Sequence, residues 1–117
     1  MYEKKRECFI KKSEKEYVAV DWGMKDILPL FWDNNIQTQE CCYGHIVGDK
    51  KGVAWIQVSP ECFGDACRLI QEVSFEKPLC ILNKTTKIAC VNKRDSKYLD
   101  KWNVDAIKGY TIMTLNE

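Results

Sequence analysis

The sequence predicts an α+β fold, a two-layer sandwich in which two helices cover one face of a mixed or mainly antiparallel sheet of about five strands. Two observations predict it. Residues 27–32 and 63–73 carry apolar side chains at helical spacing, whereas residues 17–21, 53–58 and 110–115 are short β-rich runs. Because each helix has a single apolar stripe, both stripes are buried if the two helices lie on the same sheet face.

Length and charge limit the organisation and the partners of the chain. Its 117 residues, 45% hydrophobic and 30% charged, are typical of one folded domain, so residues 1–117 are treated as a single unit. Lys and Arg number 18 and Asp and Glu 17. A protein that binds duplex DNA usually has a basic excess, because Lys and Arg neutralise the phosphates. We therefore expect no duplex DNA partner.

The composition also predicts where the protein works. No apolar run approaches the roughly 20 residues that cross a bilayer, so no membrane partner is expected. The charged N-terminal residues are not followed by the apolar segment of a signal peptide. Seven cysteines are an odd number for a disulfide framework and indicate reduced thiols. The expected location is the cytoplasm, or the host cell cytoplasm if the protein is viral.

The N-terminal third predicts a lysine-bearing edge strand at residues 7–11, a polar turn, a strand at 17–21 and then a helix. Pro29 fits the first turn if this helix begins close to Ile27. Asp21 or Gly23 is the expected cap at its start. The run Asp33-Asn34-Asn35 predicts the helix end, with an asparagine in the left-handed conformation.

Further elements follow from turn signals and β-rich runs. Residues 36–42 are weakly strand-like, and residues 44–52 contain three glycines and predict a loop with Asp49, Lys50 and Lys51 at its tip. Residues 53–58 predict the central strand. Ser59-Pro60-Glu61 is typical of a helix start with a capping hydroxyl. Two short strands then surround the predicted hairpin turn, and a final strand closes the chain. The ranges of these last elements are 79–82, 87–91 and 110–115.

The Cys-Cys-Tyr-Gly-His turn at residues 41–45 carries the chain's single histidine. Cys42 and His45 are spaced so that a zinc ion could bridge them, which makes zinc the one cofactor considered. The remaining ligands would be Cys62 and Cys67, whose i, i+5 spacing on a helix points them apart. The plainer interpretation is structural, with the cysteines in the core and the histidine bonded to backbone.

The same turn allows a thiol-dependent enzyme as a further alternative. Cys41 or Cys42 would be the nucleophile, with His45 as base and Asp49 orienting it. Such groups are usually assembled from distant segments of a chain rather than from sequence neighbours. We therefore expect no catalytic residues and a non-enzymatic protein.

The aromatic residues predict a binding surface. Trp32 and Trp55 fall on expected core faces, whereas Trp22 and Tyr43 lie beside glycines and are expected to be exposed. Exposed rings suit a protein partner or a stacked nucleobase. An alternative is that these rings only cover the sheet edge. The full set of candidate binding residues is Trp22, Tyr43, Gly44, His45, Lys50 and Lys51.

The stretch 27–58 resembles a pattern found in small uncharacterised proteins of bacteriophages and Firmicutes mobile elements. In them an apolar helix leads into Asn/Gly-Ile-x-Thr-x-x-Cys/Ser-Cys-x-Gly-His, and an Ala-aromatic-Ile strand follows. The matching residues here are Asn35, Ile36, Thr38, Cys41, Cys42, Gly44, His45, Ala54, Trp55 and Ile56. The resemblance implies a small accessory protein, encoded by a phage, that works inside a bacterial cell.

These observations lead to one expected function. The chain would be a small binding protein that inhibits a host factor, such as a bacterial defence system, by docking on a protein or by sequestering a nucleotide-like ligand. A homodimer through the sheet edge or the tryptophan-rich face is compatible with the sequence. The zinc-binding domain and the Cys/His thiol enzyme are the alternatives.

Overall fold

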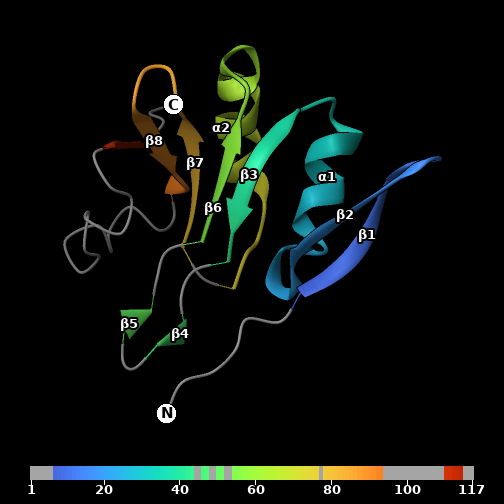
Figure 1. Cartoon of the computed structure of the whole chain (residues 1–117). Helices are drawn as coiled ribbons and strands as arrows, with labels where there is room; N and C mark the ends of the chain where they lie inside the picture. The colour runs from blue at the N-terminus through green and yellow to red at the C-terminus, as the bar shows by residue number, and fades with distance from the viewer. Residues whose placement is uncertain are drawn as a thin grey trace.

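The computed structural model of the chain describes residues 7–43, 46–47, 50–51, 54–76, 78–93 and 110–114. Its main sheet has five strands, confirming the predicted α+β class (Figure 1). Their order across the sheet is β3 (Thr38–Cys42), β6 (Ala54–Val58), β7 (Leu79–Asn83), β8 (Ile88–Val91) and β9 (Thr111–Thr114).

The pairing of these strands is mixed. β3 runs antiparallel to β6 and β7 antiparallel to β8, whereas β6 with β7 and β8 with β9 are parallel pairs. The predicted hairpin is the β7–β8 pair. The strand predicted as central is β6, which is an inner strand, but the middle position of the sheet belongs to β7. The parallel β6–β7 pair requires a crossover, which the helix between these strands provides.

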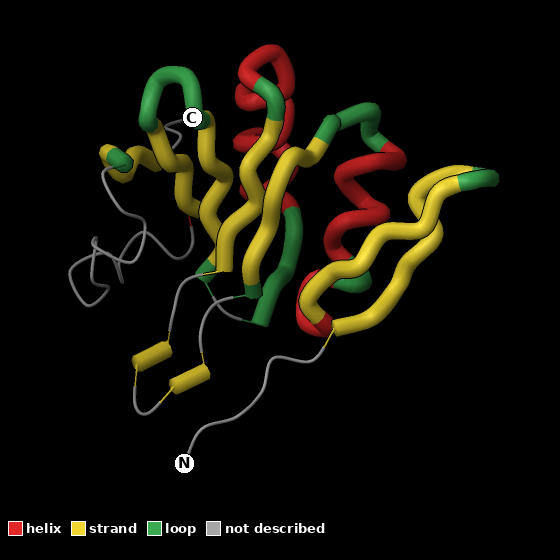
Figure 2. Tube along the Cα trace, viewed as in Figure 1, coloured by secondary structure: helices red, strands yellow, loops and turns green. Residues whose placement is uncertain are grey.

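Two helices among the described residues, α1 (Ile27–Asp33) and α2 (Phe63–Glu72), pack on one sheet face as expected (Figure 2). Phe31 of α1 and Ile70 of α2 are fully buried against Ile56 and Ile81 of the central strands. The other face carries a second cluster, in which Trp55 and Ile112 pack against buried residues of β7 and β8. No helix in the described part of the chain is long and apolar enough to span a membrane.

The start of α1 agrees with one prediction and corrects another. The helix begins at Ile27, so Pro29 lies in its first turn, where its missing N–H breaks no hydrogen bond. The expected cap at Asp21 or Gly23 is wrong, because Asp21 precedes the 3-10 helix η1 (Trp22–Met24), Gly23 lies within it, and the residue at the start of α1 is Asp26. At the other end Asn35 has φ of 60°, the left-handed conformation that the sequence predicts.

At the start of α2 the predicted proline position is also confirmed, whereas the predicted cap is wrong. A 3-10 turn, η2 (Pro60–Cys62), precedes the helix and places Pro60 first, as expected. The Ser59 hydroxyl does not cap the turn; it is buried and forms no hydrogen bond with a described residue. The predicted stripe is confirmed by the full burial of Ala66, Cys67 and Ile70.

The first two strands form a separate antiparallel hairpin, β1 (Glu7–Ser13) with β2 (Glu16–Asp21), that does not belong to the five-stranded sheet. Its inward side chains, Cys8, Ile10 and Val18 among them, pack against the α1 side of the core. Figure 1 shows the hairpin beyond α1, next to the β3 end of the sheet.

The predicted loop at residues 44–52 is partly wrong. β4 (Ile46–Val47) and β5 (Lys50–Lys51) form a short antiparallel pair within it, so both lysines lie on a strand rather than at a loop tip. Residues 44, 45 and 49 lie outside the described residues.

Candidate functional site

Tyr43 follows β3 and joins three parts of the molecule. Its backbone N–H donates to Asp21 Oδ2 at the end of β2, 2.8 Å away. Its hydroxyl donates to Glu76 Oε1, and its ring meets the ring of Phe75 edge-to-face, with 6.1 Å between centroids. The side chain is half-buried, so the expectation of a freely exposed Tyr43 is wrong. Tyr43 is anchored as a structural residue.

The position of the Tyr43 ring requires a glycine at residue 23. A Cβ atom at Gly23 would lie 2.1 Å from Cδ1 of the Tyr43 ring and 2.5 Å from its Cγ. These distances are far shorter than van der Waals contact, and a ring carbon next to the backbone cannot move away alone. The ring therefore packs directly on the backbone of η1, which only glycine permits.

Burial and the neighbouring Glu76 change the acidity of Tyr43. Desolvation of the phenol oxygen, the hydrogen bond to Glu76 and the negative charge of Glu76 together raise the pKa of Tyr43 to about 12. The hydroxyl therefore stays protonated at neutral pH and acts as a hydrogen-bond donor.

Trp22 is exposed, as the sequence predicts, with 43% of its surface accessible. It lies at the rim of a cleft of about 430 Å³ between η1, the start of α1 and the segment after α2. We call this opening the Trp22 cleft. It is lined by Trp22, Gly23, Lys25, Asp26, Ile27, Leu30, Val73, Ser74, Phe75 and Glu76.

Charged and apolar groups both line the Trp22 cleft. Lys25 Nζ lies 5.0 Å from the centre of the Trp22 indole and 3.1 Å from Asp26 Oδ2. Leu30 is 37% exposed. A cleft that combines an exposed aromatic ring with apolar and charged side chains offers contacts for a protein or a flat ligand.

The other predicted site residues are described in part or not at all. Gly44 and His45 lie outside the described residues, and the backbone of Lys50 and Lys51 forms β5. Among the candidate residues whose side chains the structure describes, Trp22 and Tyr43 are brought close through the contact of Tyr43 with Gly23.

Two cysteines of the zinc hypothesis, Cys62 and Cys67, have different surroundings. Cys62 Sγ contacts the Asn35 carbonyl at 3.9 Å. Cys67 is fully buried, and a hydrogen bond with Cys90 and burial raise the pKa of its thiol, which makes it unreactive. No group of three metal-ligating side chains occurs among the residues that the structure describes. The Cys42–His45 pair itself falls outside them because of His45.

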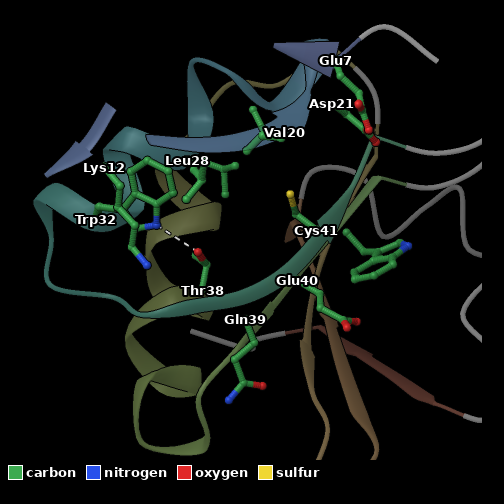
Figure 3. Close-up of a pocket in the computed structure, with 13 residues that line it drawn as sticks. Glu7, Lys12, Val20, Asp21, Leu28, Trp32, Thr38, Gln39, Glu40 and Cys41 are labelled. Carbon is green, nitrogen blue, oxygen red and sulfur yellow. Dashed lines mark hydrogen bonds between the residues drawn. The ribbon is translucent and has the colours of Figure 1, made fainter. Parts of the chain in front are cut away.

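A second opening lies on the other side of β2, and sequence reasoning missed it. A space of about 400 Å³ separates the hairpin from β3, with α1 beneath it (Figure 3). We call it the hairpin groove. No sequence signal predicts it, because it depends on which strands do not pair. Its central lining residues are Lys12, Val18, Val20, Leu28, Trp32 and Cys41.

Comparisons with protein-family models, with curated proteins and with solved structures give no match to this chain. The fold and its two openings define an α+β domain with two candidate binding surfaces.

Proposed function

We propose that this protein is a non-enzymatic accessory protein that docks on a host protein inside a bacterial cell and inhibits it. The exposed Trp22 indole at the rim of a cleft lined by both apolar and charged side chains carries the proposal. Tryptophan is enriched among the residues that dominate protein interfaces, because it buries a large area at low entropic cost. The bacterial setting, with a defence system as target, rests on the resemblance of residues 27–58 to phage proteins.

The surroundings of Trp22 support a protein partner. Trp22 and Leu30 offer exposed apolar surface, while Lys25, Asp26 and Glu76 supply both signs of charge in the same cleft. Protein interfaces combine apolar contacts with polar and charged groups in this way. Tyr43 contributes by fixing Gly23 and Glu76, so its role in docking is to position the cleft.

A nucleotide-like ligand is the second candidate function. Lys25 Nζ above the Trp22 ring places a cation beside a stacking surface, the pair of groups that binds a base and its phosphate. The two candidates differ in what co-purifies with the chain. Native mass spectrometry of reduced protein would show a nucleotide-sized adduct that Trp22→Ala removes.

Photo-crosslinking in a Firmicutes host tests the docking proposal. A photoreactive amino acid at Leu30 should give one discrete cross-linked protein, and Trp22→Ala should remove most of it. The matched control carries the same amino acid at Lys84, an exposed residue in the turn after β7. The proposal is wrong if no cross-link forms, if Lys84 captures the same protein or if Trp22→Ala has no effect. Inhibition is then measured by titrating the captured protein's activity with this chain.

A further inference from the structure

The strand β1 is an edge strand whose outer side pairs with no described residue. Within the described residues it pairs with β2 alone. Figure 1 shows β1 at the outer side of the hairpin, away from β3. Backbone groups alternate in direction along an antiparallel strand, so every second residue of β1 presents its N–H and C=O to this edge. Such an edge is a template for pairing with another extended strand.

The outer face of the hairpin carries exposed aromatic rings. Phe9 is 76% and Tyr17 62% exposed. In the hairpin register Phe9 lies opposite Ala19 and Tyr17 lies opposite Lys11, so the two rings are diagonal neighbours on one face. Neighbouring aromatic rings in contact with water are typical of a surface that is covered in an assembly.

The inner face of β1 also offers apolar side chains at the edge. Cys8 and Ile10 are half-buried, and they lie opposite Val20 and Val18 of β2. Both pack against the core from the hairpin side. A strand added beyond β1 would therefore meet apolar side chains on this face as well as on the outer one.

The charges of β1 are self-complementary. Glu7 and Lys11 are exposed and lie on the outer face, two residues before and two residues after Phe9. If two copies of β1 pair antiparallel with Phe9 opposite Phe9, Glu7 of each copy lies opposite Lys11 of the other. A shift of two residues in either direction places Phe9 opposite Glu7 or Lys11 and forms neither ion pair. A shift of one residue turns the apolar inner face outward, so the sequence of β1 selects a single register.

Both charged groups are available for pairing between copies. Glu7 forms no ion pair with a described residue, and Figure 3 shows its carboxylate beside that of Asp21, its register partner. Lys11 Nζ lies 3.8 Å from Glu14 Oε2, and these side chains are 50% and 95% exposed. An exposed ion pair of this length contributes little stability, so Lys11 can exchange it for the glutamate of a second copy.

We propose that the protein forms a symmetric dimer in which β1 pairs antiparallel with β1 of a second copy, with Phe9 at the symmetry axis. The two hairpins then form one antiparallel sheet. The Phe9 rings lie at the centre of its outer face, and a Glu7–Lys11 ion pair flanks them on each side.

The expected dimer is weak, because residues 7–11 of each copy make only a small interface. We expect a Kd of tens of micromolar, so that the protein is mainly dimeric at about 200 µM and monomeric at about 1 µM. None of these residues lines the Trp22 cleft, and the dimer does not rest on the proposed function.

Charge-swapped variants of the full chain test the dimer and its register together. Sedimentation equilibrium of the wild type should give twice the chain mass of 13.7 kDa at about 200 µM. Glu7→Lys and Lys11→Glu each place like charges opposite one another, and each should weaken self-association by about tenfold. A mixture of the two variants restores both ion pairs between unlike chains and should associate as the wild type does. The double variant, which exchanges the two charges within one chain, should also dimerise normally.

The matched control is Glu61→Lys, the same charge change at an exposed position on η2, which should leave the dimer unchanged. Thermal denaturation at about 1 µM checks that each variant is folded, and exposed substitutions should leave the midpoint nearly unchanged. A wild-type monomer at about 200 µM would overturn the proposal. A dimer that survives both single reversals would also overturn it, as would one that neither the mixture nor the double variant restores. These results would assign self-association to another surface or another register.

Discussion

The five-stranded sheet and the β1–β2 hairpin bury their residues very differently. Every residue of β7 and all but Trp55 of β6 are buried, whereas Val20 is the one buried residue of the hairpin strands. The sheet is covered on its helix side by α1 and α2, while Phe9 of the hairpin is 76% and Tyr17 62% exposed. Hydrophobic stabilisation follows buried apolar area, so the sheet carries most of the stability.

The hairpin is held to the rest of the described structure by few specific contacts. These include the Asp21–Tyr43 hydrogen bond and the contact of Lys12 with Trp32. Both candidate binding surfaces lie at this junction, one on each side of the end of β2. The comparison indicates a stable sheet layer with a less stable hairpin at its edge.

The largest effect should come from the sheet. Ile81→Ala removes a fully buried side chain in the middle of β7 and should lower the free energy of unfolding by about 2–5 kcal/mol. The matched hairpin variant, Phe9→Ala, should change it by less than about 0.5 kcal/mol, because the ring is exposed. Urea denaturation measures both. Similar losses in the two variants would contradict the division of roles.

Gly23→Ala should break the junction itself. The new Cβ would overlap the Tyr43 ring, and we expect a loss of about 1–3 kcal/mol in unfolding free energy. Gly64→Ala is the control, since a Cβ there lies 3.7 Å from the nearest atom, on Arg68. It should stabilise α2 by about 0.5–1 kcal/mol. Opposite signs in thermal denaturation are the predicted result, and a neutral Gly23→Ala would refute the packing described.

Trp32→Phe keeps an aromatic ring but removes the donor to Thr38 Oγ1. We expect a loss of about 0.5–1.5 kcal/mol in unfolding free energy. A double-mutant cycle with Thr38→Val isolates the hydrogen bond, because the second change should cost little once the donor is absent. Additive losses would mean that Trp32 does not hold β3 through this bond.

The smallest effect should appear at high pH. The pKa of Tyr43 is raised from 10.0 to about 12 in the folded chain, so its protonated form is favoured by folding. The associated stability is complete below pH 10 and is lost as pH rises from about 10 to about 12. Wild-type protein should therefore lose more stability over this range than Tyr43→Phe. Parallel pH profiles of the two proteins would argue against the buried, Glu76-bonded hydroxyl.

Local patterns predicted the elements well because they depend on nearby residues. Pro29 located the start of α1, and Asn35 its left-handed end. The helical spacing of apolar residues also predicted the buried stripe of α2. Strand pairing was not predictable in this way, since periodicity reports that a strand is half-buried and not which strand it joins. The separation of the hairpin from the main sheet was therefore missed.

The candidate site was predicted only in part for the same reason. Trp22 was correctly expected to be exposed. Tyr43 was wrongly expected to be exposed, because its hydrogen-bond partners Asp21 and Glu76 lie 22 and 33 residues away in the sequence. Asp21 was expected as a cap of α1, but its carboxylate accepts from Tyr43 N–H and α1 begins after Asp26, so a local capping rule failed against a tertiary contact. The hairpin groove depends on tertiary geometry alone.

Native-state hydrogen exchange tests the central comparison most directly. The amides of β6 and β7 should exchange only through global unfolding. Their free energy of exchange should therefore fall with denaturant concentration as steeply as the free energy of global unfolding does. The amides of β2, Val18 to Val20, should exchange through a local opening at lower free energy. Equal protection of β2 and β7, falling together with denaturant, would contradict the account and make the hairpin part of one cooperative unit.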